Sequence, residues 1–264
     1  MKLSGKTAVV TGASRGIGRS LAVALAREGC SLVLTALEPD ELDAVAVDLG
    51  RECGFPIATR AADLTDPADC QAFAEWLQGL KAPCDIFINN AGGGWFGSFT
   101  ACSWESLQRT LLLNVYAPTF LAHAVLPMLR DRPEAMIVNI SSAVATLPYP
   151  GLAVYGAAKA FISSLSASLQ CELGEGSVRL LCFHPGFTAT PFISSAGMDL
   201  AKVSPRLISS PEALARHIVR SMKRNRSWAY SDAAGRFGAA LAAALPHRLR
   251  IRLFRNLFWE VPGP

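Results

Sequence analysis

Two residues in the middle of the chain have the spacing for acid–base chemistry. Tyr155 and Lys159 stand four residues apart in YGAAK, thirteen residues after Ser142. If residues 156–173 form a helix, the phenol and the ammonium share one of its faces. A positive charge beside a phenol favours phenolate, so Lys159 is expected to lower the pKa of Tyr155 from about 10. Such a phenol could exchange a proton with the oxygen of a carbonyl or an alcohol.

The pair YxxxK also occurs by chance, with a packed tyrosine and a solvated lysine, so it is informative only beside a cofactor site. A candidate site lies near the N-terminus. Residues 6–11 are an apolar, β-prone run, GASRGIG follows, and residues 19–29 have helical spacing. Gly12, Gly16 and Gly18 permit close backbone approach, and the N–H groups at a helix start attract a pyrophosphate. The alternative is a plain glycine-rich turn between a strand and a helix.

Six motifs together carry a family resemblance. They are TGASRGIG (11–18), NNAG (89–92), Asn114, Ser142, YxxxK (155–159) and HPGFTAT (184–190). In order and spacing they resemble the short-chain dehydrogenase/reductase family over nearly all of residues 4–231. The resemblance implies a nicotinamide-dependent oxidoreductase. It also implies a homodimer or homotetramer in which helices at 104–130 and 153–175 pair across subunits.

The resemblance also implies catalytic roles. Tyr155 would protonate the substrate oxygen, Ser142 would hydrogen-bond the same oxygen, and Lys159 would hold the ribose hydroxyls of the cofactor. Ser141 competes with Ser142, and the thirteen-residue spacing to the tyrosine favours Ser142. Asn114 would anchor a water in a proton relay. A buried asparagine in an apolar helical run is otherwise costly, although it could instead be a satisfied residue at a helix kink.

Charge indicates the choice of cofactor. The second strand ends at Ala36 and Leu37 without the acid that usually accepts from an unphosphorylated ribose. Arg15, within the glycine turn, could pair with a 2′-phosphate. NADP(H) is therefore preferred, with NAD(H) as the alternative. One position departs from the family pattern: members that bind the phosphorylated cofactor often carry a second arginine where this chain has Leu37. Together with the glycine turn and Arg15, the resemblance implies cofactor contacts at Gly12, Ser14, Arg15, Gly16, Ile17, Gly18, Asp63, Leu64, Asn90, Ala91, Gly92, Tyr155, Lys159, Pro185, Gly186, Thr188 and Thr190.

Strands and helices alternate along the chain. Strands are expected at residues 6–11, 31–36, 56–62, 84–89, 135–141, 178–184 and 228–231. Helices are expected at 40–52, 67–80, 104–130, 153–175 and 211–224, with bends at Pro118 or Pro127. This βα pattern predicts an α/β fold with a single doubly wound, Rossmann-type parallel sheet and helices on both faces. With neither linker nor repeat, the chain is expected to be one domain.

Composition narrows the class of protein. Of 264 residues, 51% are apolar and 17% charged, which leaves little room for disorder. The net charge of +4 is too mild to indicate a nucleic-acid partner. We expect neither a secretory signal nor a membrane-spanning stretch. The seven cysteines form no CxxC pair, so no metal site is expected and reduced thiols of a cytoplasmic protein are favoured.

Three segments should border the substrate: residues 93–103, 143–152 and 187–204. The candidate pocket residues are Gly94, Trp95, Phe96, Val144, Leu147 and Phe192, an aromatic and aliphatic set without a charged clamp for an acid. These side chains predict a hydrophobic ketone, aldehyde or alcohol as the substrate, although some could simply pack a lid. The alternatives are a 3-oxoacyl thioester reductase and a non-catalytic dinucleotide-binding sensor or scaffold.

A helix-prone extension closes the chain, over residues 233–264. Residues 233–245 are alanine-rich, and HRLRIRLFRNLFW (247–259) sets arginines against leucine and phenylalanine. The second stretch is typical of an amphipathic basic helix, which could make peripheral contact with an anionic membrane. The other interpretation, which the sequence favours, is that it covers a partner subunit or the substrate lid.

Overall fold

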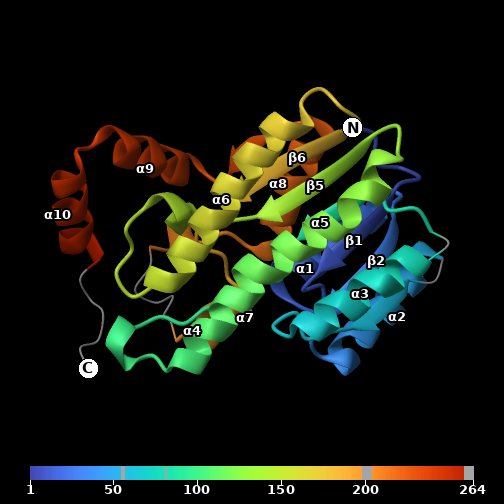
Figure 1. Cartoon of the computed structure of the whole chain (residues 1–264), viewed down its shortest axis with the longest axis horizontal. Coiled ribbons are helices and arrows are strands. Elements are labelled where there is room, and N and C mark those ends of the chain that lie inside the picture. The colour runs from blue at the N-terminus through green and yellow to red at the C-terminus, as the bar shows by residue number, and fades with distance from the viewer. Residues whose placement is uncertain (55–56, 81, 198–203, 259–264) are drawn as a thin grey trace.

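One parallel sheet organises the molecule. The computed structural model describes residues 1–54, 57–80, 82–197 and 204–258. Seven strands lie in the order β3-β2-β1-β4-β5-β6-β7, and every neighbouring pair is parallel (Figure 1). The strands are β1 (Thr7–Thr11), β2 (Ser31–Ala36), β3 (Ala58–Ala61), β4 (Ile86–Asn89), β5 (Ala135–Ile140), β6 (Val178–His184) and β7 (Trp228–Tyr230). The predicted doubly wound sheet is confirmed; Pro56, the expected start of the third strand, lies outside the described residues.

Helices cover both faces of the sheet. They are α1 (Gly16–Arg27), α2 (Pro39–Cys53), α3 (Pro67–Gly79), α4 (Trp104–Leu111), α5 (Ala117–Arg130), α6 (Ala153–Leu173), α7 (Pro191–Ser195), α8 (Pro211–Lys223), α9 (Ala233–Ala244) and α10 (His247–Phe258). One apolar core joins the sheet to α1, α2 and α8. A second core joins it to α3, α5 and α6. The predicted helical C-terminal tail is confirmed as α9 and α10 up to Phe258, and residues 259–264 of it lie outside the described residues.

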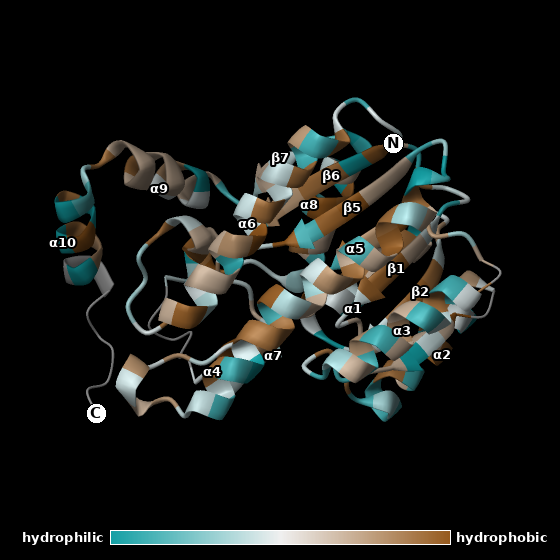
Figure 2. Cartoon of the chain, viewed as in Figure 1, coloured by the Kyte–Doolittle hydropathy of each residue, from teal (hydrophilic) through white to brown (hydrophobic). Residues whose placement is uncertain are grey.

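The strand sequences explain why both faces are covered. The side chains of β1, β4 and β5 are buried along their whole length, and the labelled β1 and β5 are largely brown in Figure 2. A parallel strand buried on both sides is apolar throughout rather than alternating. The strand order turns back beside β1, whose neighbours are β2 and β4. Ligands bind beyond the carboxyl ends of the strands at such a point.

The long helix expected at 104–130 is interrupted rather than simply bent. A π-helical turn, Leu112–Tyr116, separates α4 from α5 and ends just before Pro118, which has no N–H to continue the ladder. Pro127 lies inside α5 without breaking it. By length and composition the whole run could cross a membrane, which was not expected. However, Leu121, Val125 and Leu129 are buried in the second core, so α5 serves as a covering helix of the sheet.

Candidate active site

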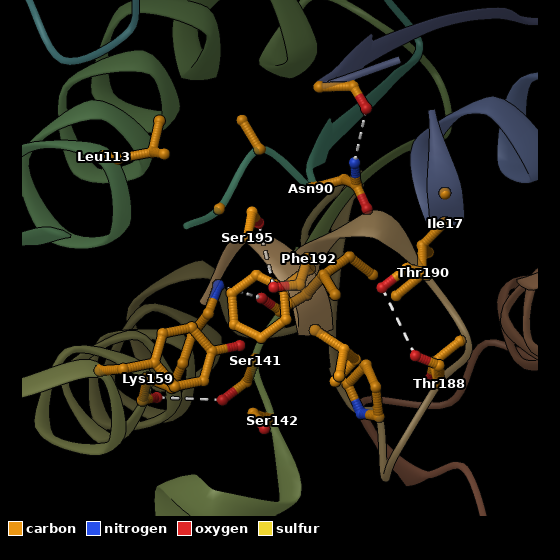
Figure 3. Close-up of a pocket in the computed structure, with 18 of the residues that line it drawn as sticks. Ile17, Asn90, Leu113, Ser141, Ser142, Lys159, Thr188, Thr190, Phe192 and Ser195 are labelled. Carbon is orange, nitrogen blue, oxygen red and sulfur yellow. Dashed lines mark hydrogen bonds between the residues drawn. The ribbon is translucent and has the colours of Figure 1, made fainter. Parts of the chain in front are cut away.

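A cavity of about 430 Å³ opens at the carboxyl ends of the central strands. It runs from the glycine turn after β1 to the segments after β5 and β6, and Figure 3 shows part of its lining. Most of the predicted site residues line it together: Gly12, Ser14, Arg15, Gly16, Ile17, Asp63, Leu64, Asn90, Ala91, Gly92, Ser142, Val144, Leu147, Tyr155, Lys159, Pro185, Gly186, Thr188, Thr190 and Phe192. Residues 198–203 of the third predicted substrate segment lie outside the described residues.

The glycine turn has the geometry of an anion cradle. Gly12 and Gly16 adopt positive φ angles of 64° and 56°. A Cβ on Gly12 would stand 2.8 Å from the Cα of Ala91, so only glycine fits. The residue before α1, Arg15, makes no side-chain cap hydrogen bond. The first N–H groups of α1 can therefore serve a diphosphate at the end of the cavity that Gly16 and Ile17 line.

Gly18 differs from the other predicted cofactor contacts. It does not line the cavity. A Cβ at this position would lie 2.0 Å from the carbonyl oxygen of Gly12 and 2.5 Å from Nδ2 of Asn90. Gly18 thus permits α1 to pack tightly against the end of β1, and its predicted cofactor contact is corrected to a packing role.

Asn90 ties the two strands at the switch point together. Its Nδ2 donates to the carbonyl oxygens of Thr11 at 2.8 Å and Gly12 at 3.1 Å. The Thr11 hydroxyl accepts from the backbone N–H groups of Asn90 and Ala91, each at 3.0 Å. Asn90 also faces the cavity (Figure 3), so its side chain fixes the shape of the glycine turn from inside the site.

Asp63 has a partner that the sequence did not indicate. Its Oδ1 accepts from the N–H of Thr65 at 2.9 Å and from the Thr65 hydroxyl at 2.7 Å. Nη2 of Arg109, on α4, lies 3.7 Å from Asp63 Oδ2. Burial works to raise the pKa of Asp63, but the bonds from Thr65 and the charge of Arg109 together hold it below its ordinary value. Arg109 lines the cavity, yet in the sequence it is one charge among others on an amphipathic helix.

The catalytic candidates meet at the other end of the cavity. Tyr155 hydrogen-bonds Ser142, which opposes the effect of burial, but burial dominates and raises the pKa of Tyr155 to about 12. Lys159 is buried and its Nζ donates to the carbonyl oxygen of Ile140 at 3.0 Å. Burial lowers the pKa of Lys159 to about 8. The expected lowering of the Tyr155 pKa by Lys159 is not found: Nζ lies 5.6 Å from the centroid of the phenol ring, and the causes that shift this pKa are the burial of the phenol and its bond with Ser142.

The hydroxyls of the two competing serines have different hydrogen-bond partners. The hydroxyl of Ser141 lies 2.8 Å from that of Ser163 and donates to the carbonyl oxygen of Lys159 at 3.0 Å. Ser141 also lines the cavity, but these bonds engage its hydroxyl and tie the end of β5 to α6. Ser142 instead bonds Tyr155. The structure places Ser142, the serine chosen by spacing, against the phenol.

Asn114 projects from the π-helical turn toward the same region. Its Nδ2 donates to the carbonyl oxygens of Gly93 at 2.7 Å and Thr110 at 2.8 Å. Its Oδ1 is buried and has no partner among the described residues. A buried acceptor without a partner is costly, so Asn114 is not a fully satisfied kink residue. The unpaired oxygen fits a water or a ligand hydroxyl beside Lys159.

The substrate end of the cavity is apolar. Phe192 packs against Tyr155 with ring centroids 5.2 Å apart. Ile193, in the third predicted segment, also lines the wall. Beyond these, the wall contains residues not singled out from the sequence: Tyr149, Leu152, Phe187, Leu207, Ala234 and Gly235. Most of these follow β5 or β6, in or near segments expected to border the substrate. Ala234 and Gly235 belong to α9, and nothing in their types marks them as pocket residues.

Gly94, Trp95 and Phe96 were predicted in the substrate pocket, and the structure corrects this. None of them lines the main cavity. A Cβ on Gly94 would stand 2.9 Å from Cδ2 of Tyr155, so the segment packs against the back of the phenol ring. Trp95 borders a separate space of about 10 Å³. The ring of Phe96 covers Gly151, where a Cβ would lie 2.6 Å from Cε2. Gly94 therefore packs on the tyrosine ring and Phe96 on Gly151, and all three residues lie outside the lining of the main cavity.

The sequence matches the family model described as short chain dehydrogenase over residues 6–200. The chain belongs to the short-chain dehydrogenase/reductase family. It is an NAD(P)-dependent dehydrogenase or reductase, as the resemblance implied. The helices α9 and α10 lie beyond the matched region.

Relatives of known name cover most of this short-chain dehydrogenase. Oxidoreductase UcpA of Salmonella typhimurium is 34% identical over 195 residues, which is 74% of this chain and 73% of the relative. A short-chain dehydrogenase from Sphingobium yanoikuyae, solved in complex with NADPH, is 33% identical with a TM-score of 0.82 and covers 92% of this chain and 97% of its own. A bulky-bulky ketone specific alcohol dehydrogenase from Comamonas testosteroni is 29% identical with a TM-score of 0.77 and covers 98% of this chain and 95% of its own.

Proposed function

We propose that this enzyme interconverts a hydrophobic ketone or aldehyde and its alcohol with NADP(H). The observation that carries the proposal is the apolar wall around the phenol of Tyr155. Among the described lining residues at this end, the charged one besides Lys159 is Asp232, whose carboxylate already accepts from Gly235 N at 2.7 Å and from the Ser231 hydroxyl at 2.5 Å. A polar or anionic substrate would lack a cationic clamp here. The similarity to a dehydrogenase for bulky ketones supports the same class.

The residues of the chain divide the acid–base work. In reduction, Tyr155 gives its proton to the carbonyl oxygen while Ser142 donates a hydrogen bond to the same oxygen and stabilises its developing charge. In oxidation, both steps reverse. When bound, the nicotinamide supplies or accepts the hydride, and its positive charge in the oxidised form favours phenolate. Lys159 would hold the ribose hydroxyls of the cofactor and Asn114 would hold a water, so that these two residues could support return of the proton to Tyr155.

Binding of the phosphorylated cofactor is proposed from Arg15. It lines the cavity next to Leu37, where the end of β2 carries no carboxylate, and a guanidinium suits a 2′-phosphate. Glu38, one residue further, also lines the cavity and opposes this choice, so NAD(H) is the alternative. A relative that is solved with NADPH supports the preference.

A homodimer or homotetramer in the cytoplasm is proposed for the assembly. The helices expected to pair across subunits expose large apolar side chains: Trp104, Leu111, Tyr116 and Phe161. Large apolar side chains exposed together on neighbouring helices are typical of a surface that a second subunit covers. Sedimentation of the purified chain would measure the assembly, and a monomer at micromolar concentration would contradict it.

A substrate panel tests the proposed reaction. Oxidation of NADPH would be followed with bulky aromatic and aliphatic ketones, a small 2-oxo acid, and a 3-oxoacyl thioester. We expect kcat/KM to be highest for the bulky ketones and lowest for the 2-oxo acid. The highest rate with the thioester would assign the enzyme to acyl reduction. Tight NADPH binding without turnover of any carbonyl would assign it to a sensing or scaffolding role.

A further inference from the structure

Positive charge is concentrated in the C-terminal arm, which we define as residues 233–258. The arm contains Arg236, Arg248, Arg250, Arg252 and Arg255 and no aspartate or glutamate. The whole chain has 25 basic and 21 acidic residues. Without the arm, 20 basic residues face 21 acidic ones, a net charge of −1. The arm therefore holds all of the excess positive charge of the protein.

The outer surface of α10 combines this charge with exposed apolar side chains. Arg248, Arg252 and Arg255 follow helical spacing on one face and are exposed. Leu249 and Leu253 flank this stripe on one side and Ile251 on the other, with exposed fractions of 55%, 36% and 43%. Figure 2 shows the resulting mixture of teal and brown on α10.

The neighbouring helix extends the apolar surface. On α9, Phe237 is 70% exposed and Leu241, four residues later, is 37% exposed. Both helices extend away from the sheet (Figure 1). Phe237 and Leu241 are large residues that α9 does not use to pack on the body of the protein. An uncovered apolar surface on two consecutive helices indicates a binding surface.

Inward contacts hold the two helices together. Nη1 of Arg250 donates to the carbonyl oxygen of Ala242 at 3.4 Å, and its Nη2 lies 3.2 Å from Nδ1 of His247. Phe254 is buried. The bond from Arg250 to Ala242 joins α10 to α9, whereas the contact with His247 lies within α10, and the arginine and leucine stripes are left exposed.

We propose that the C-terminal arm docks on an anionic membrane surface. Leucine, isoleucine and phenylalanine side chains would enter the boundary between headgroups and acyl chains, while the arginines extend to lipid phosphates. A symmetric contact between two copies of this face would set arginine stripes against each other without an acid in either arm, which is unfavourable. Charge complementarity therefore favours lipid phosphate over a second copy of the chain.

The position of the arm connects docking with the substrate cavity. Ala234 and Gly235 line the cavity, and a Cβ on Gly238 would lie 3.8 Å from Cδ1 of Leu147 in its wall. Docking would hold the apolar end of the cavity near the bilayer, where lipophilic ketones and alcohols partition. This consequence rests on the proposed function, whereas docking itself does not.

Vesicle sedimentation with the full chain tests docking without any activity assay. We expect the wild type to bind vesicles containing phosphatidylglycerol and to bind pure phosphatidylcholine vesicles far more weakly. R248Q/R252Q/R255Q should weaken binding to the anionic vesicles about 100-fold, since each arginine near the surface contributes about tenfold or less. L249S/L253S should weaken binding to both kinds of vesicle. Unchanged thermal melting would show that the variants fold.

A matched control uses three exposed arginines elsewhere. R216Q/R220Q/R224Q, with two positions on α8 and the third at its C-terminal cap, removes the same charge and should leave vesicle binding unchanged. Equal losses in the two triple variants would overturn the proposal, since the effect would then come from net charge. Absence of binding by the wild type would also overturn it. If L249S/L253S instead dissociated an oligomer and no vesicle bound, the face would be a subunit contact.

Discussion

The Oδ1 atom of Asn114 and the Nζ atom of Lys159 converge beside Gly92. A Cβ placed on that glycine would lie 3.0 Å from the first and 3.2 Å from the second. One atom comes from the π-helical turn and the other from α6, so two helical segments must keep their register for the pair to form. Asn114 Oδ1 has no other partner among the described residues. The arrangement suits one water that bonds both groups.

Replacing Asn114 by alanine should therefore impair proton return more than binding. We expect kcat to fall about 10- to 100-fold, as for loss of one acid–base contribution, with little change in the KM for the cofactor. Thr119→Val removes a hydroxyl that donates to Val115 O at 2.6 Å on the same helical run, away from Lys159, and serves as the control. Steady-state kinetics would measure both variants. An equal loss in the control would mean that the helix, not the asparagine oxygen, limits the rate.

Tyr155→Phe removes the proposed proton donor and keeps its ring packing. Phe192 and Gly94 contact the ring rather than the hydroxyl, so the fold should survive. We expect kcat to fall by about three orders of magnitude or more while NADPH binding, measured by fluorescence titration, stays within about threefold. A variant that turns over ketone at the wild-type rate would refute the role assigned to the phenol.

Lys159 should make stability depend on pH in a defined direction. Burial lowers its pKa from 10.5 to about 8 in the folded protein. Between these two pKa values the unfolded chain binds the proton more strongly than the folded chain, so the free energy of unfolding rises with pH. Below about pH 8 both states carry the proton, and the cost of burying the charged lysine is complete. Lys159→Met lacks this dependence. From pH 7 to pH 10, the free energy of unfolding of the wild type relative to the variant should increase by up to about 3 kcal/mol.

Chemical denaturation of both proteins at each pH would measure that difference. All other titrating groups are shared, so their contributions cancel to first order. If the difference between the two proteins stayed constant or fell as pH rose, Lys159 would have an ordinary or raised pKa in the folded state. The proton that returns to Tyr155 would then have to come from a group other than Lys159.

The sheet and the glycine turn were predictable because their signals are local. β1 is a run of buried residues followed directly by Gly12 and Gly16, and each property appears in consecutive letters of the sequence. Local periodicity and turn chemistry decide such features without reference to the rest of the chain. The choice of Ser142 over Ser141 came instead from the family resemblance, whose serine stands thirteen residues before the tyrosine.

The substrate wall was less predictable because it depends on long-range packing. Trp95 and Phe96 have the composition of pocket residues, yet their loop turns behind Tyr155, and Gly94 is the position at which that close approach is possible. Conversely, Ala234 belongs to a helix far along the chain, and its alanine-rich sequence predicts a helix but no place in the cavity wall. The sequence also predicted a lowered pKa for Tyr155, whereas the structure raises it, because spacing reveals a nearby charge but not the degree of burial.

Arg15→Ala tests the cofactor preference. Loss of one charged hydrogen-bonding partner to a phosphate costs about 1.5–3 kcal/mol, so the KM for NADPH should rise about 10- to 100-fold. The KM for NADH should change far less, because that cofactor has no 2′-phosphate for the guanidinium to bind. Parallel initial-rate measurements with both cofactors would decide. Equal increases for both would place Arg15 at the shared diphosphate and leave the preference unexplained.

Ala234→Phe should narrow the substrate cavity from the side of α9. Ala234 lines the cavity, and a phenyl group there would occupy space next to the wall that Leu147 and Gly235 share. We expect kcat/KM for bulky ketones to fall by about tenfold or more while small ketones keep most of their rate, since one badly fitting group costs about 1–3 kcal/mol. Ala240→Phe, on the same helix but outside the cavity lining, controls for added bulk. If both variants treated large and small ketones alike, α9 would cover the cavity without shaping it.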